Sequence, residues 1–208
     1  MTIDPVLALD SFRQKDAVMA RLLERALAAE HPVAIPKTKS EHEHFGSVVT
    51  SIVSQQISTR AAGAVRRRVL DFLGDFTPEA VMAADFDELK ACGLSNQKTK
   101  YIKHNAEVWH TLPVSDFEQM TDEEVIAELT RLYGIGRWTA EMFLMFSLAR
   151  PDVFSYGDLG LMNSLCKNYG YKPRYVRKIA ATVESWSPHR TTASLALWHT
   201  VDNGPVLL

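Results

Sequence analysis

The segment LYGIGRWTA at residues 132–140 decides how the chain around it is expected to fold. Ahead of it, Thr121 and Glu124 have the spacing of a helix-capping box, and the apolar residues that follow recur on one helical face. On its C-terminal side, an apolar stretch over residues 137–149 predicts a second helix, which ends before Pro151. The segment is therefore predicted to be a tight turn between two helices.

The two glycines of this turn suggest a place where an anion could approach the backbone. Gly134 and Gly136 can adopt conformations that are closed to other residues, and the N–H groups at the start of the next helix favour a negative charge. Ile135 between them is expected to point into the core. On spacing alone, however, a Gly-x-Gly link is more often an ordinary turn between helices without any ligand.

A single aspartate follows the turn at a position that suits a stable carboxylate. Asp158 lies about twenty residues beyond the glycines, after the break at Pro151, and is predicted to begin another helix. Taken alone, it would simply cap that helix, which is the common role of an aspartate in this position. Its combination with the preceding glycine turn is what suggests a catalytic carboxylate.

The rest of the chain predicts an all-α protein. Helix signals dominate, and no window alternates with period two for long enough to indicate a strand. Thr77-Pro78 and Asp85 mark two further helix starts. Because no low-complexity linker is present, any lobe boundary must fall at a short turn, and the loop around Pro113 is the preferred place. The expected division is an N-terminal helix and linker over 1–40 that packs with the C-terminal lobe, a helical lobe over 41–112, and a lobe over 113–208 that carries the turn and the aspartate.

Composition and charge narrow the class of protein. With 46% hydrophobic and 23% charged residues, the 208-residue chain can bury a real core, and its net charge of −2 argues against binding nucleic acid through bulk charge. Basic residues nevertheless gather in segments 54–70, 92–104 and 159–190. This segregation predicts a local positive face able to hold a few phosphates, with scattered solvated charge as the alternative.

Cysteine content and hydropathy favour a soluble protein of a reducing compartment. Cys92 and Cys166 are too few for a disulfide framework, a four-thiolate zinc site or a four-thiolate iron–sulfur cluster. Residues 1–10 show no basic segment of a signal peptide, and Ser147 interrupts the longest apolar stretch.

The glycine turn and the aspartate together resemble the helix-hairpin-helix DNA glycosylase superfamily, and most of all its DNA-3-methyladenine glycosylase II branch. The resemblance covers about residues 41–199 and includes two further motifs. Residues 45–58, FGSVVTSIVSQQIS, are similar to the helix and turn that meet the DNA minor groove in that family, and CGLS at 92–95 with Lys98 is the third match. The resemblance implies a two-lobed helical fold with the active site in the cleft between the lobes, without the N-terminal β-rich domain of larger members.

The implied activity is that of a monofunctional DNA glycosylase in base excision repair. It would hydrolyse the N-glycosidic bond of alkylated purines, 3-methyladenine first and 7-methylguanine as a further candidate, with Asp158 stabilising charge on the deoxyribose and orienting or deprotonating water. Bifunctional relatives carry a lysine where this chain has Trp138, so AP-lyase activity is expected to be absent.

The base pocket implied by the resemblance consists of Trp138, Met142 and His189, the last two standing where aromatic residues would be expected. Aromatic residues on helices are also common core residues, and this alternative applies to Trp138 and to the remaining aromatics Phe143, Phe146, Tyr156 and Trp198.

The implied DNA contacts lie in the two turns. They are Gln55, Gln56, Ser58, Gly134, Ile135, Gly136, Arg137 and Thr139. Gln56 takes the place of the wedge that fills the gap left by a flipped base, where the best-known members carry an apolar side chain. Hairpin carbonyls of Thr130, Leu132 and Gly134 would hold a structural Na⁺ or K⁺, while the chemistry requires no cofactor and no iron–sulfur cluster.

The expected partner is double-stranded DNA containing a damaged base, bound by a monomer with no membrane association, in the cytoplasm of a bacterium or the nucleus of a eukaryote. Two alternatives remain open at this point. One is a non-catalytic helix-hairpin-helix DNA-binding module, and the other is a glycosylase for mismatched or oxidised bases.

Overall fold

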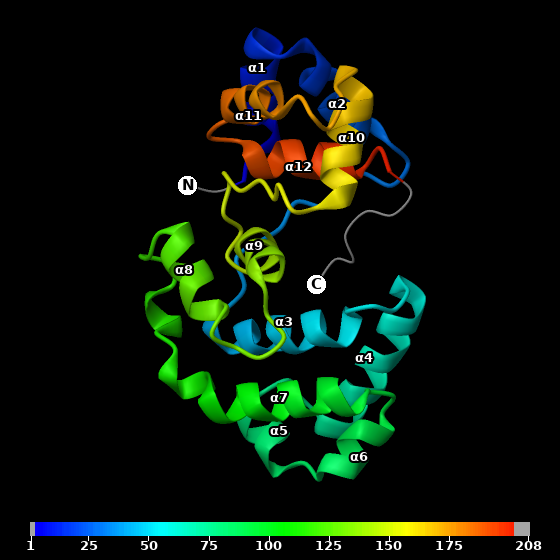
Figure 1. Ribbon diagram of the computed structural model, residues 1–208, viewed down its shortest axis with the longest axis vertical. Helices are drawn as coiled ribbons and strands as arrows, with labels where there is room; N and C mark the ends of the chain where they lie inside the picture. The colour runs from blue at the N-terminus through cyan, green and yellow to red at the C-terminus, as the bar shows by residue number, and fades with distance from the viewer. Residues whose placement is uncertain (1–2, 202–208) are drawn as a thin grey trace. The chain divides into compact units, whose positions relative to one another are not determined.

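The computed structural model describes residues 3–201, and every regular element within that range is a helix (Figure 1). The predicted all-α fold is confirmed. The chain divides into two compact units: unit 1 combines the described residues of Met1–Lys37 and Ala149–Pro205, and unit 2 is Thr38–Leu148. None of the described helices is long and apolar enough to cross a membrane.

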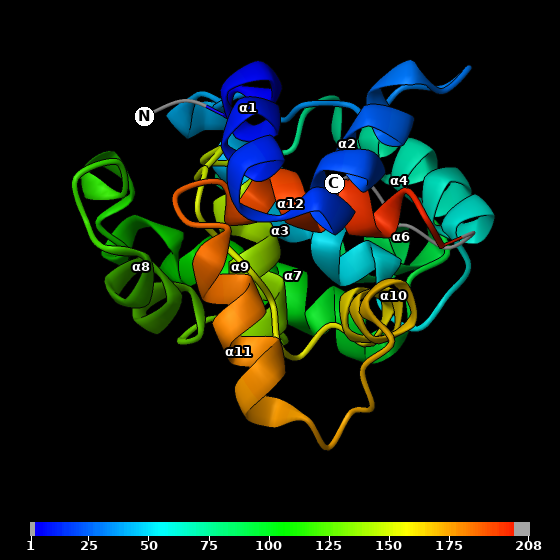
Figure 2. The same ribbon diagram turned by 90° about the horizontal axis from the view of Figure 1, so that it is seen from above.

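Unit 1 joins the two ends of the chain. Its helices are α1 (Pro5–Lys15), α2 (Ala17–Ala28), α10 (Leu159–Tyr169), α11 (Val176–Ser185) and α12 (Arg190–Trp198). Helix α1 packs against α2, and α12 packs against both α2 and α10 (Figures 1 and 2). The first helices of the sequence are therefore held by the last ones.

Asp16 is the polar centre of unit 1. One of its carboxylate oxygens caps α2 by accepting from the backbone N–H groups of Val18 and Met19, both at 3.0 Å. The other accepts from the Tyr169 hydroxyl at 2.7 Å and from the indole N–H of Trp186 at 2.9 Å. Burial and this carboxylate raise the pKa of Tyr169 far above its usual range, so the phenol stays a donor.

Asp16→Ala is expected to lower the free energy of unfolding by about 3 kcal/mol, because it removes a helix cap and leaves the buried Trp186 indole and the half-buried Tyr169 hydroxyl without this acceptor. Urea unfolding would measure the change. Asp10→Ala is the control, since Asp10 lies exposed on the neighbouring helix and pairs with Arg13 only at 3.4 Å. If the urea midpoint of Asp16→Ala equalled that of the control, the hydrogen bonds of Asp16 would contribute nothing measurable to stability.

Unit 2 contains the remaining helices. They are α3 (Glu41–Ser54), α4 (Thr59–Leu73), α5 (Pro78–Ala83), α6 (Phe86–Ala91), α7 (Asn96–Val108), α8 (Asp122–Leu129) and α9 (Arg137–Phe146), with short 3-10 turns η1 at Trp109–Thr111 and η2 at Val114–Asp116. Helix α3 packs against α4, α7 and α9, while α7 also packs against α5 and α6. Helix α9 is thus tied both to α8 and to α3.

The predicted lobe boundary near residue 113 is wrong, since residues 113–148 belong to the same unit as residues 38–112. The end of α9 explains this. The Ser147 carbonyl accepts from the Lys39 N–H at 2.8 Å, and the Ser147 hydroxyl bonds to Nδ1 of buried His44 at 2.9 Å. These contacts join segments about a hundred residues apart, which no local sequence pattern reveals.

Three of the basic residues in the predicted positive segments serve the fold itself. Arg68 Nε donates to the Cys92 carbonyl at 2.7 Å, just after α6. Lys103 Nζ donates to three carbonyls at the end of α5 (Val81, Met82 and Ala84). Lys98 Nζ donates to two carbonyls at the end of α3, those of Val53 and Gln55, and its burial lowers its pKa. Arg60, Arg66, Arg67 and Lys100 remain exposed.

Candidate functional site

The turn between α8 and α9 has the predicted geometry at its first glycine. The capping box of Thr121 and Glu124 starts α8 as expected. Gly134 has a φ of +78°, and a Cβ there would lie 2.4 Å from a ring carbon of Tyr101, so no other residue fits without strain. Ile135 is 6% exposed, which confirms that it points into the core.

The second glycine differs from the prediction. Gly136 has φ −98° and ψ 176°, an extended conformation open to any residue, and a Cβ there would meet nothing within 4 Å. The expectation of an unusual backbone is therefore right for Gly134 and wrong for Gly136. Gly136 is the exposed N-cap residue of α9 and makes no side-chain cap, so the first N–H groups of that helix are not covered by a capping side chain.

The hairpin is clamped by neighbouring helices. Asn105 of α7 donates to the Tyr133 carbonyl at 3.0 Å and accepts from the Tyr133 N–H at 2.8 Å. Gln55, at the end of α3, donates through Nε2 to the Gly134 carbonyl at 2.8 Å. The structure thereby brings together Gln55 and Gly134, two of the predicted DNA-contacting residues, from positions 79 residues apart.

Lys98 holds the turn that follows α3. Its Nζ donates to the carbonyls of Val53 at 2.7 Å and Gln55 at 2.6 Å. Gln56 follows with a φ of 58°, a left-handed conformation that costs a non-glycine residue about 1 kcal/mol, and its side chain is exposed. The adjacent Ile57, which the sequence reasoning did not single out, is 39% exposed. Ser58 caps α4 by accepting from the Ala61 N–H.

Arg137, predicted to meet DNA, is engaged by two carboxylates of its own unit. Its guanidinium donates to both oxygens of Glu123 and, through Nε, to Glu141 at 3.0 Å. The hydrogen bond to Glu123 is the main reason that the pKa of Arg137 lies above its usual range. Both Arg137 and Glu123 are exposed, so this pairing is weak and can be exchanged for another anion. Thr139, two residues further along α9, is buried at 8% exposure.

Asp158 caps α10, as its position predicted. Its Oδ1 accepts from the Leu161 backbone N–H at 2.7 Å and from the indole N–H of Trp198 at 3.2 Å. The residue is 9% exposed, whereas the neighbouring Leu159 is 78% exposed. A carboxylate fixed by two N–H donors and placed beside an exposed apolar side chain can stabilise a developing positive charge on a bound molecule.

The predicted base-pocket residues are distributed over both units. Trp138 and Met142 lie one turn apart on α9 in unit 2, where Trp138 is 43% exposed and Met142 is 2% exposed. His189 of unit 1 precedes α12, packs edge-on against Phe12 at 6.2 Å between ring centroids, and has a pKa lowered by burial. Of the three, Trp138 is the most exposed residue.

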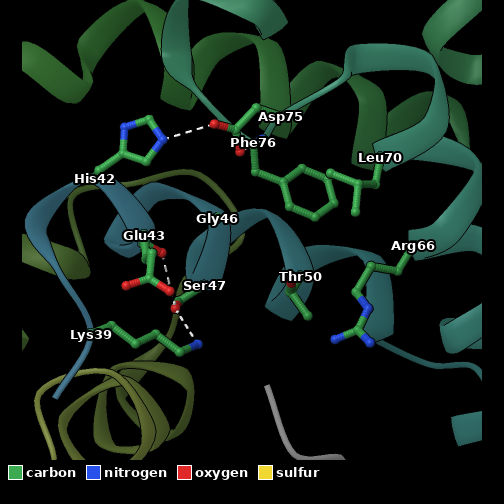
Figure 3. A pocket seen from close by; sticks show the side chains of 10 residues that line it. All are labelled: Lys39, His42, Glu43, Gly46, Ser47, Thr50, Arg66, Leu70, Asp75 and Phe76. Atoms are coloured by element: carbon green, nitrogen blue, oxygen red, sulfur yellow. Dashed lines mark hydrogen bonds and ion pairs between the residues drawn. The ribbon is translucent and has the colours of Figure 1, made fainter. Parts of the chain in front are cut away.

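A cavity of about 360 Å³ lies in unit 2, between the first half of α3, the second half of α4 and the loop before α5 (Figure 3). It is lined by Lys39, His42, Glu43, Gly46, Ser47, Thr50, Arg66, Leu70, Asp75 and Phe76. None of these is a predicted site residue. His42 pairs with Asp75 at 2.8 Å and Lys39 donates to Ser47 at 2.9 Å, so these polar groups tie the walls of the cavity together.

A metal centre built from side chains is not present in the described part of the chain: no group of three or more His, Cys, Asp or Glu within residues 3–201 could hold an ion. The hairpin carbonyls of the predicted Na⁺ or K⁺ site are partly engaged. Leu132 accepts from the Ile135 N–H at 3.3 Å and Gly134 from Gln55. Each carbonyl has a second lone pair, so the set still fits a cation.

Comparison with known proteins identifies the family. The profile described as HhH-GPD superfamily base excision DNA repair protein matches residues 49–189, a range that begins in α3 and ends just before α12. The chain belongs to this superfamily. The match spans both turns and Asp158, so the resemblance deduced from three motifs is confirmed.

Individual relatives of the superfamily agree with this assignment. DNA-3-methyladenine glycosylase 1 of Schizosaccharomyces pombe is 35% identical over 178 residues, which cover 79% of this chain and 75% of the relative. The crystal structure of a DNA-3-methyladenine glycosidase from Bacillus halodurans superposes with a TM-score of 0.76 at 35% identity, covering 95% of this chain and 90% of that one. The S. pombe enzyme Mag1 in complex with abasic DNA gives 0.74 at 32% identity, with 92% and 95% coverage.

Within this superfamily assignment, Glu123 is expected to hold back the affinity for DNA by occupying Arg137. Glu123→Gln should raise affinity for a duplex with an abasic site about two- to fivefold and steepen its dependence on salt, because a cation becomes available to phosphate. Fluorescence anisotropy would measure both. Glu24→Gln is the matched control, since Glu24 pairs with Arg13 at 2.8 Å in another exposed bridge, in unit 1. Equal changes in both variants would mean that net charge alone is responsible.

Proposed function

We propose that this chain is a monofunctional DNA glycosylase that hydrolyses the N-glycosidic bond of alkylated purines in duplex DNA. The observation that carries the proposal is its 35% identity to a DNA-3-methyladenine glycosylase over most of both chains. The local geometry supports it, because the hairpin exposes helix N–H groups suited to a phosphate and Asp158 offers a fixed carboxylate.

The proposed chemistry needs little from the protein beyond placement and charge. The damaged nucleotide must leave the stack before its sugar can be reached, and the exposed Gln56 and Ile57 are the side chains that would fill the gap. As the bond between C1′ and the base breaks, its electron pair leaves with the base and positive charge grows on the deoxyribose. The Asp158 carboxylate stabilises this charge and orients the water that adds to C1′, whose proton passes to the carboxylate or to solvent.

The choice of an alkylated purine follows from the same argument. Such a base already carries positive charge and leaves readily, so no strong general acid is required. Trp138, which is 43% exposed, is the candidate to recognise it through a cation–π contact. Met142 and His189 are buried, at 2% and 8% exposure, so neither presents a broad surface on which a base could stack.

The same tryptophan supports a monofunctional enzyme. Trp138 has no amine with which to form a Schiff base, so we propose that the abasic product leaves with its strand intact. A Na⁺ or K⁺ at the carbonyls of Thr130, Leu132 and Gly134 would add positive charge near a bound phosphate without taking part in the chemistry. We further propose that the chain acts on damaged DNA as a monomer.

The test is release of free 3-methyladenine and 7-methylguanine from methylated duplex DNA, followed by alkali treatment of the product. Release of either base, with strand breaks appearing only after alkali, would support the proposal. DNA binding without release of any base would overturn it in favour of a non-catalytic hairpin module. Release of oxidised or mismatched bases, without release of alkylated ones, would show that the proposed substrate class is wrong.

A further inference from the structure

We infer that Trp198 is a positioning residue for Asp158, holding the carboxylate in its working orientation through the indole N–H; this inference rests on the proposed function. The sequence alone offers only the ordinary interpretation of Trp198 as a core aromatic. The structure adds a specific polar contact, because the indole Nε1 lies 3.2 Å from Asp158 Oδ1. Trp198 is 4% exposed and Asp158 9% exposed, so water screens this bond little.

The indole is fixed relative to the carboxylate by the packing of α10 on α12. Asp158 begins α10 and Trp198 ends α12. Between the two helices, the buried hydroxyl of Ser164 donates to the Leu197 carbonyl at 2.9 Å and bonds to the Thr200 hydroxyl at 2.6 Å. The Leu197 backbone before Trp198 and the Thr200 side chain after it are thereby anchored to the helix that carries Asp158.

Gly160 provides a second, independent observation. A Cβ at this position would lie 3.1 Å from Asp158 Oδ1 and 3.7 Å from Cδ1 and Nε1 of Trp198. The nearest atoms to such a Cβ therefore belong to the two residues that form the bond, Asp158 and Trp198. The absence of a side chain at residue 160 lets the indole approach the carboxylate.

The consequence concerns orientation. The cap bond from the Leu161 N–H exists at many helix starts and constrains a single direction. A second donor on the same oxygen, arriving from another helix, restricts rotation of the carboxylate, so that the group meets the deoxyribose in one geometry. Misplacement of a reacting group by a fraction of an ångström is enough to slow an enzyme severalfold or more.

Trp198→Phe removes the N–H and keeps a ring in the core. Under single-turnover conditions, we expect base excision to slow about tenfold, while the affinity for a duplex with an abasic site stays within about twofold of the native value. Trp186→Phe is the matched control, since Trp186 is a buried indole of the same unit whose N–H donates to a different carboxylate, Asp16, at 2.9 Å. We expect it to lower stability without slowing excision.

Gly160→Ala tests the same contact from the other side. Alanine favours a helix over glycine by about 1 kcal/mol, which offsets part of the cost of the close contact, so this variant should stay folded. Excision should nevertheless slow, because the added methyl group presses on the carboxylate and the indole. Native excision rates in both Trp198→Phe and Gly160→Ala, or equal slowing in Trp198→Phe and Trp186→Phe, would overturn the inference.

A spectroscopic arm separates this inference from the proposed function. In the ¹⁵N-labelled protein without DNA, Asp158→Asn should move the indole N–H resonance of Trp198 and leave that of Trp186 in place. An unmoved Trp198 resonance overturns the inference whatever the activity. A moved resonance with no excision of any base by the native chain supports the contact and rejects the proposed function.

Discussion

Asp158→Asn is expected to slow base excision roughly a thousandfold, while affinity for damaged duplex DNA stays close to the native value. Asparagine has the shape of aspartate, and its carbonyl oxygen can still accept from the Leu161 N–H and the Trp198 indole. The helix cap therefore survives and only the negative charge is lost. Single-turnover release of 3-methyladenine and anisotropy with an abasic duplex would measure the two quantities.

The control for this variant is Asp85→Asn. Asp85 also caps a helix, accepting from the N–H groups of Asp87 at 2.8 Å and Glu88 at 3.1 Å. Its substitution removes the same charge from the same structural role and should leave excision unchanged. Excision by Asp158→Asn within a few fold of the native rate would show that Asp158 only caps α10, and the catalytic assignment would fail.

Helix starts could be predicted from the sequence because each depends on a few adjacent residues. Thr77, Asp85, Thr121 and Asp158 all cap helices in the structure, as their spacing indicated. The end of α9 was predicted less accurately. The predicted helix runs to residue 149, whereas α9 ends at Phe146 and Ala149 has a left-handed φ of 49°. A helix end in an apolar stretch is set by tertiary contacts, here those of Ser147 with Lys39 and His44.

Long-range pairs could not be predicted in this way. The bond from Gln55 to Gly134 joins positions 79 residues apart, and that from Trp198 to Asp158 joins positions 40 apart. Neither pair has a local signature, so the sequence indicated the separate motifs but not how they support one another. For the same reason, the sequence could not show which basic residues support the fold and which are available to phosphates. Only the structure shows that Lys98 caps the end of α3.

Gly134→Ala is expected to destabilise unit 2 by roughly 2–5 kcal/mol and to abolish measurable DNA binding at low micromolar concentrations. The left-handed conformation at φ +78° costs alanine about 1–2 kcal/mol, and the methyl group would overlap the Tyr101 ring, at a further cost of about 1–3 kcal/mol. Urea unfolding and anisotropy would measure the two effects. Gly170→Ala separates the causes, because Gly170 has a similar φ of +64° with nothing within 4 Å of its Cβ position, so only the conformational cost applies.

Gly136→Ala should behave in the opposite way and so reveals what the hairpin binds. Its extended backbone accepts alanine and no atom lies within 4 Å of the added methyl group, so the variant should stay folded and lose only the roughly 0.5–1 kcal/mol by which alanine is a poorer N-cap residue than glycine. If a phosphate approaches the N–H groups at the start of α9, the methyl group obstructs it, and affinity for duplex DNA should fall more than about tenfold. Native affinity in a folded Gly136→Ala variant would mean that the phosphate does not bind at the start of α9.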